Sequence, residues 1–120
     1  MKKILVVDDD FEIRTVVEKI LKKNNFIVEG ISKWEYLTYS IQYFKPDLIL
    51  LDVSLEGADG REMCNQLKQS KPTSHIPVIL FSAYPNLLQN LNECKPDAVI
   101  TKPFDNLMLV ETIKQNLSKN

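Results

Sequence analysis

Five polar or charged residues stand at or just beyond the ends of short apolar runs in the sequence. They are Asp8, Asp9, Asp52, Ser82 and Lys102. If the runs are parallel strands, their carboxyl ends meet at one edge of a sheet, with neighbouring strands about 4.8 Å apart. The three aspartates would then share one crevice. At an effective dielectric constant near 20, two unit charges about 4 Å apart repel by roughly 4 kcal/mol. Such a crevice requires a compensating positive charge.

A hard divalent cation with oxygen ligands supplies that charge best. Mg²⁺ in particular prefers one or two carboxylates together with water and phosphate oxygens. Lys102 would add a fixed positive charge nearby. With both in place, a carboxylate becomes a nucleophile toward phosphorus, because aspartate can form a covalent aspartyl-phosphate. The metal, the lysine and the Ser82 hydroxyl would stabilise the dispersed charge of the transition state.

The elements that must position these residues alternate along the chain. Short apolar runs at 4–7, 26–31, 48–51, 78–81 and 98–100 alternate with amphipathic stretches, as in βα units. Helices are expected over 11–23 and 32–44, around Met63 and Leu67, over 86–92, and from the N-cap Asp105 to Leu117. Ser32 and Glu35 form a capping-box pattern at the second helix, and Gly57 and Gly60 indicate a loop before the third. The alternation predicts an α/β fold with a doubly wound, five-stranded parallel sheet of order 2-1-3-4-5.

Length and charge narrow the classes of function. The 120 residues predict one domain spanning 1–120, and the formal net charge of -1 argues against binding to nucleic acid or an anionic membrane. The apolar run at 4–7 is too short for a signal peptide, so we expect a cytoplasmic protein. Cys64 and Cys94 lack metal-ligand spacing and are expected to be free thiols.

Several residues receive no function at this stage. His75, the single histidine, lies in a proline-flanked connection and is expected at the surface. Four aromatic residues lie near the second helix, and we expect them to be part of the core with only their polar edges at the surface. They are Trp34, Tyr36, Tyr39 and Tyr43.

The motifs together resemble the receiver domain of bacterial two-component response regulators, including the chemotaxis regulators with a flavodoxin-like fold. The matching segments, in family order, are Ile-Leu-Val-Val-Asp-Asp-Asp at 4–10, Pro-Asp-Leu-Ile-Leu-Leu-Asp-Val at 46–53, Asp-Gly at 59–60, Phe-Ser-Ala at 81–83 and Thr-Lys-Pro-Phe at 101–104. Any one alone is weak, but their order over almost the whole chain is specific.

This resemblance implies a role for each site residue. Asp52 would be the phosphoacceptor, Asp9 would bind Mg²⁺ directly, Asp8 would act through a metal-bound water, and the Ser54 carbonyl would complete the metal site. Ser82 and Lys102 would contact the phosphoryl oxygens, and the Lys102–Pro103 bond is expected to be cis. The phosphoryl donor would be a histidine kinase or phosphotransfer protein. The output would pass through an effector protein, phosphorylation-dependent dimerisation or onward phosphotransfer.

Three departures from the family pattern concern switching. Val99 stands where the family usually keeps an aromatic, and Glu56 replaces a common proline after the acceptor. The segment from Ser82 to Lys102 is short and carries Pro85 and Pro96, so the fourth helix is expected to be atypical.

Two other functions stay open. One is a Mg²⁺-dependent phosphatase with an aspartate nucleophile, but these enzymes have a second acid two residues later, where this chain has Ser54. The other is an interaction module that works without phosphate. The intact acidic residues argue against it, because such a module has no need to bury mutually repelling carboxylates.

Overall fold

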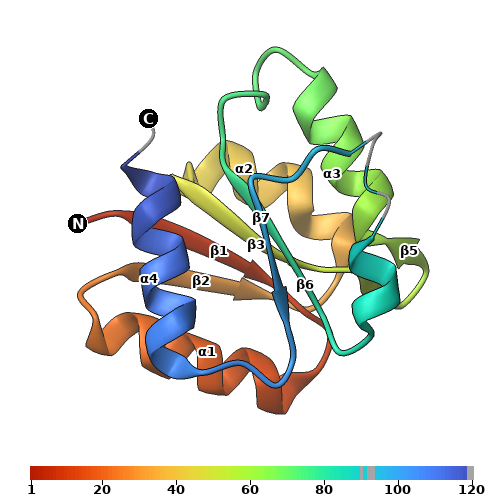
Figure 1. Cartoon of the computed structure of the whole chain (residues 1–120). Helices are drawn as coiled ribbons and strands as arrows, with labels where there is room; N and C mark the ends of the chain where they lie inside the picture. The colour runs from red at the N-terminus through yellow and green to blue at the C-terminus, as the bar shows by residue number, and fades with distance from the viewer. Residues whose placement is uncertain (90, 92–93, 119–120) are drawn as a thin grey trace.

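A parallel sheet of five strands forms the centre of the molecule, in the order β2-β1-β3-β6-β7. The computed structural model describes residues 1–89, 91 and 94–118. The strands are β1 (Lys3–Val7), β2 (Ile27–Ile31), β3 (Leu48–Asp52), β6 (Val78–Ser82) and β7 (Ala98–Thr101) (Figure 1). Each lies within one residue of its predicted bounds. The predicted fold class and strand order are therefore confirmed.

The three central strands are apolar because both of their faces are covered. In β1, β3 and β6, successive side chains point to opposite faces of the sheet. Leu5 and Val7 pack in one core cluster with residues of α2 (Leu37–Phe44) and α3 (Gly60–Gln69). Ile4 and Val6 pack in another with residues of α1 (Phe11–Lys23) and α4 (Asn106–Leu117). The sheet is thus the middle of three layers (Figure 1).

The register of the sheet brings the strand ends to one edge. Val7 lies beside Leu51, Asp52 beside Phe81, and Ser82 beside Thr101. The residues that follow β1 and β7 therefore lie near the last residue of β3. A site shared by these residues requires this alignment of the strand ends, as the sequence predicts.

Side-chain caps fix where three of the helices begin. Asp10 accepts hydrogen bonds from Glu12 and Ile13 at the start of α1, and Asp105, as predicted, caps α4. Asp59 caps α3, so Gly60 is its first residue rather than part of a loop. Each such cap is worth about 1 kcal/mol.

The second helix begins differently from its prediction. The chain enters it through a 3₁₀ turn, η1 (Trp34–Tyr36), whose N-cap residue is Lys33 and has no side-chain cap. The prediction of a capping box of Ser32 and Glu35 is therefore wrong, because the tighter turn moves Ser32 out of the cap position.

The aromatic residues of this region are exposed, which contradicts their assignment to the core. Leu37 and Ile41 take the inward face of α2, so Tyr39 and Tyr43 point outward and Tyr43 is 65% exposed. Trp34 and Tyr36 are exposed as well. The helical period was consistent with either face, and the aliphatic residues fill the core.

The predicted fourth helix over 86–92 is also wrong in its described part. It is a 3₁₀ turn, η2 (Pro85–Leu88), followed by extended Gln89, while Asn92, where the helix was to end, lies outside the described residues. Leu87 and Leu88 still pack against the core. So short a segment gains few helical hydrogen bonds, and packing of its leucines decides its conformation.

A small antiparallel hairpin follows the third strand. It consists of β4 (Ser54–Leu55) and β5 (Ala58–Asp59), joined through Gly57, whose φ of 79° favours glycine. The expected loop is thus an ordered connection between β3 and α3. Elsewhere, His75 is at the surface as predicted. No helix in the described part of the chain is long and apolar enough to cross a membrane.

Candidate functional site

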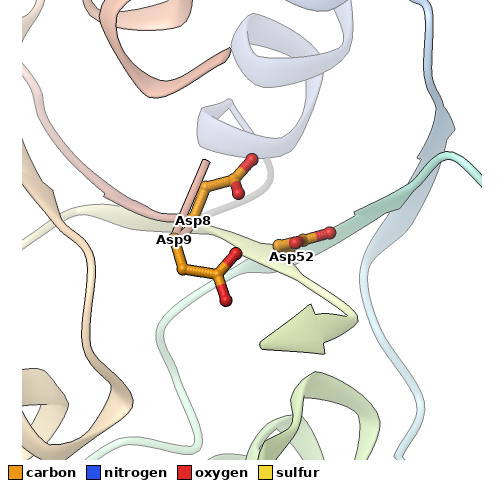
Figure 2. A group of neighbouring side chains, drawn as sticks. All are labelled: Asp8, Asp9 and Asp52. Carbon is orange, nitrogen blue, oxygen red and sulfur yellow. The ribbon is translucent and has the colours of Figure 1, made fainter. Parts of the chain in front are cut away.

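Asp8, Asp9 and Asp52 converge at the carboxyl edge of the sheet. Each offers a carboxylate oxygen, and these oxygens all lie within 4.8 Å of one another. Figure 2 shows the first two side chains leaving the end of β1 and the third leaving the neighbouring end of β3. Asp8 is fully buried, Asp52 is 5% exposed and Asp9 is exposed. The site is therefore open on the side of Asp9.

Backbone contacts hold Asp8 in place. Its own N–H donates to the carbonyl of Ile31, and its Oδ1 accepts the N–H of Asp10 at 2.9 Å. The Arg14 side chain donates to the Asp8 carbonyl at 2.8 Å. A buried carboxylate is costly unless it is hydrogen-bonded, and the carboxylate of Asp8 has the Asp10 N–H on Oδ1 and the Lys102 ammonium on Oδ2.

Asp9 connects the site to the hairpin. Its Oδ2 accepts the backbone N–H of Glu56 at 2.7 Å, across 47 positions of sequence. Proline has no N–H and could not donate this bond. Glu56, where the resemblance led us to expect a proline, thus makes a contact to a predicted metal ligand that the sequence did not indicate.

Lys102 supplies the positive charge inside the acidic group. Its Nζ lies 2.9 Å from Asp8 Oδ2 and 3.3 Å from Asp52 Oδ1, with the side chain 10% exposed. The ammonium also lies 4.4 Å from the centroid of the Phe81 ring, a favourable cation–π position. The Lys102–Pro103 peptide bond is cis, as expected.

The charge balance of the site suits a divalent cation. The three carboxylates carry three negative charges and Lys102 carries one positive charge, which leaves two uncompensated. The donors are hard oxygens, which Mg²⁺ prefers, and Asp9 is open to solvent. This set of residues therefore fits the predicted metal.

Burial and the neighbouring negative charge both act on the pKa of Asp52. It is raised from its ordinary value of 3.8 to about 6, first by burial and then by the negative charge of Asp8. Lys102 and a backbone hydrogen bond from Ser54 oppose the rise in pKa but do not cancel it. A bound divalent cation would favour the ionised form, which is the nucleophilic one.

Ser82 is buried at the end of β6, one residue beyond the partner of Asp52 in the sheet. Its Oγ accepts the N–H of Tyr84 at 3.0 Å. Its backbone carbonyl accepts the N–H of Lys102 at 2.8 Å, which ties the two strand ends together.

Sequence reasoning missed the reason for glycine at position 60. A Cβ there would meet the backbone carbonyl oxygen of Asp52, so only glycine lets α3 begin against the end of β3. The Gly60 N–H also donates to the Val53 carbonyl at 2.8 Å. The Asp-Gly pair at 59–60 was the available signal: its aspartate caps α3 and its glycine leaves room for the acceptor strand.

The model of the response regulator receiver domain matches residues 4–114. The chain belongs to the response regulator receiver domain family. Among solved structures, this receiver is similar to the signal receiver domain of a histidine kinase from Syntrophus aciditrophicus. That match has 29% identity and a TM-score of 0.90, and covers 99% of this chain and 92% of the other.

Two further solved structures are similar to this receiver. A CheY-like response regulator receiver domain from Methanospirillum hungatei is 29% identical with a TM-score of 0.87, covering 99% of this chain and 95% of the other. A response regulator receiver domain from Bermanella marisrubri is 28% identical with a TM-score of 0.87, covering 96% and 97%. This receiver domain has an acidic pocket of Asp8, Asp9 and Asp52, of the kind in which receivers typically bind Mg²⁺.

Two of the three expected departures lie on β7 and after β6. Val99 is on the edge strand β7, pairs with Leu80 and is 45% exposed. The unusual fourth segment begins three residues beyond Ser82, at Pro85.

Proposed function

We propose that this receiver domain, spanning 1–120, accepts a phosphoryl group on Asp52 from a phosphohistidine, in a Mg²⁺-dependent reaction. The proposal rests above all on one observation: the nearly buried Asp52 carboxylate lies beside two other carboxylates and 3.3 Å from the Lys102 ammonium. Asp9, Asp52 and the Ser54 carbonyl would hold the metal directly, and Asp8 through a water. When bound, the metal would neutralise the carboxylates and the charge of the incoming phosphoryl group.

The chain's own residues do the rest of the chemistry. A carboxylate oxygen of Asp52 attacks phosphorus, the P–O bond forms, and the P–N bond to the donor imidazole breaks. Lys102 and the Ser82 hydroxyl contact the phosphoryl oxygens and stabilise their charge. Receiver domains are typically not enzymes, and we propose that catalysis here is limited to the domain's own phosphorylation and slow dephosphorylation.

Phosphorylation would change the contacts of Ser82. Its Oγ now accepts the Tyr84 N–H at 3.0 Å, and a phosphoryl group on Asp52 offers new acceptor oxygens for the hydroxyl. Turning toward them draws the chain after β6 inward and favours a conformer that is minor without phosphate. A histidine kinase or phosphotransfer protein would be the donor. The rearranged surface would then bind an effector or a second copy, or pass the phosphoryl group on.

The direct test is incubation with acetyl phosphate, with and without Mg²⁺, followed by intact mass spectrometry. We expect one phosphoryl adduct in the presence of Mg²⁺ and none in Asp52→Asn. A folded, Mg²⁺-binding protein that forms no adduct with acetyl phosphate or with a phosphorylated histidine kinase would instead favour an interaction module that works without phosphate.

A further inference from the structure

A groove runs between α2 and α3 on the face of the domain beside the acidic site. It encloses about 820 Å³, and its apolar lining includes Leu37 and Ile41 from α2 and Met63 and Leu67 from α3. A space of this size accommodates a few large side chains. None of these residues has a role in the phosphoacceptor site.

One end of the groove is formed by Trp34 and the β4–β5 hairpin. Trp34 is 39% exposed, and its indole Nε1 lies 3.5 Å from where a side chain on Gly57 would begin. Gly57 and Ala58 also line the groove. The exposed tryptophan thus lies against the tip of the hairpin and adds an aromatic wall to the aliphatic floor.

The rim of the groove is acidic. Glu35, Asp59 and Glu62 line it, and among the described residues of the lining Lys45 is the one cation. Asp59 is paired with Arg61 at 2.7 Å, whereas Glu35 and Glu62 are exposed beside the opening. An occupant that buries apolar side chains here would therefore place its flanking residues against negative charge. Basic residues are the complement of this rim.

We propose that this groove docks a short amphipathic segment of a partner protein, whose apolar side chains contact Trp34, Ile41 and Met63 and whose Lys or Arg side chains face Glu35 and Glu62. Grooves of this kind commonly take one face of a helix, with apolar residues at helical spacing. The acidic rim disfavours an anionic membrane surface as the occupant.

The hairpin links this docking groove to the acidic site. Its Glu56 N–H donates to Asp9 at 2.7 Å, while the next residue, Gly57, lies against Trp34. A cation at the acidic site would draw on the same Asp9 carboxylate that accepts the Glu56 N–H, so its binding would weaken or redirect this contact and shift the hairpin wall of the groove. This second part of the proposal rests on the metal site of the proposed function, and it makes docking affinity depend on Mg²⁺.

The test uses two synthetic helix-forming peptides with leucines at helical spacing, one with lysines and one with glutamates at all other positions. Trp34 is the only tryptophan, so its fluorescence reports docking directly. We expect the lysine peptide to bind and to shift the emission of Trp34 to shorter wavelength, and the glutamate peptide not to bind. In the double variant Glu35→Lys, Glu62→Lys, the lysine peptide should lose roughly tenfold in affinity and the glutamate peptide should gain.

The matched control is the double variant Glu12→Lys, Glu111→Lys, which reverses two exposed glutamates on α1 and α4, on the other face of the sheet. It should leave affinity for the lysine peptide within about twofold. Equal binding of both peptides, or unchanged binding in the double variant Glu35→Lys, Glu62→Lys, would overturn the docking proposal. If calorimetry shows that Mg²⁺ binds but peptide affinity does not change, the coupling is refuted. Absence of Mg²⁺ binding would instead contradict the metal site of the proposed function.

Discussion

Replacing Gly60 by alanine should damage the acceptor strand through its backbone. The added Cβ would overlap the carbonyl oxygen of Asp52 and lie 2.9 Å from both the Asp52 carbonyl carbon and the Val53 Cα. These are backbone atoms of a buried strand end and cannot rotate away. Either β3 or the first turn of α3 must therefore move, and the 2.8 Å hydrogen bond from the Gly60 N–H to Val53 would lengthen.

The size of this effect follows from two opposed contributions. Forcing extra atoms into a packed region costs about 1 to 3 kcal/mol, while alanine gains up to about 1 kcal/mol over glycine inside a helix. We expect a net loss of about 1 to 2 kcal/mol, measured by urea unfolding. Because Asp52 moves with its carbonyl, the rate of adduct formation with acetyl phosphate should also fall.

Gly30→Ala is the matched control. A Cβ at Gly30 would lie 2.6 Å from Glu18 Oε1 and 2.9 Å from Glu18 Cδ, at the far end of a flexible side chain that can move aside. It would lie 3.0 Å from Arg14 Cδ, so Arg14 must give only slightly and can keep its hydrogen bond to the Asp8 carbonyl. We expect a change in unfolding free energy within about 0.5 kcal/mol and an unchanged rate of adduct formation. If Gly60→Ala were as stable as the wild type and formed the adduct as fast, the contact between α3 and the acceptor strand would not have the role assigned to it.

Three further outcomes follow from the charges of the molecule. Without Mg²⁺, folding stability should fall as pH rises from about 4 to about 6, because the folded state holds a proton on Asp52 more tightly than the unfolded chain does. Each pKa unit is worth about 1.4 kcal/mol, so the free energy of unfolding of Asp52→Asn should exceed that of the wild type by up to about 3 kcal/mol at pH 7. Urea unfolding curves that coincide at pH 7 would contradict this. Lys102→Met should lower the free energy of unfolding by about 3 kcal/mol in metal-free buffer, because Asp8 loses its buried partner. Mg²⁺ should restore much of this stability. An equal loss with and without Mg²⁺ in thermal melts would speak against charge as the cause. Burial first, and then the neighbouring Cys94, raises the pKa of the Cys64 thiol to about 12. Cys64 should therefore react with iodoacetamide far more slowly than free cysteine at pH 8. Comparable rates would refute its burial.

The fold and the central residues of the site follow from local patterns. A short, β-branched apolar run that ends abruptly at Asp8 is typical of a strand covered on both faces, and the same holds for the run before Asp52. Parallel pairing then brings these strand ends together without further information. For this reason the convergence of the three aspartates and Lys102 could be predicted from sequence.

Other features depend on tertiary context that no local pattern contains. The stripe of Tyr39 and Tyr43 has helical spacing, but whether it faces the core depends on which side Leu37 and Ile41 occupy. The β4–β5 hairpin has strands of two residues each, too short for a periodic signal. Its contact between Glu56 and Asp9 spans 47 positions and involves a backbone N–H, which every residue except proline carries. The role of Gly60 is likewise visible only against the backbone of another element.

We expect the phosphoryl group to reside on the side chain of Asp52. Borohydride reduces an acyl phosphate of aspartate to homoserine, which marks the modified residue permanently. After reaction with acetyl phosphate and Mg²⁺, reduction and proteolysis, we predict homoserine at position 52 by peptide mass spectrometry, and none when Mg²⁺ is omitted. An adduct that maps to Asp8, Asp9 or Ser82, or that forms equally without Mg²⁺, would contradict the account.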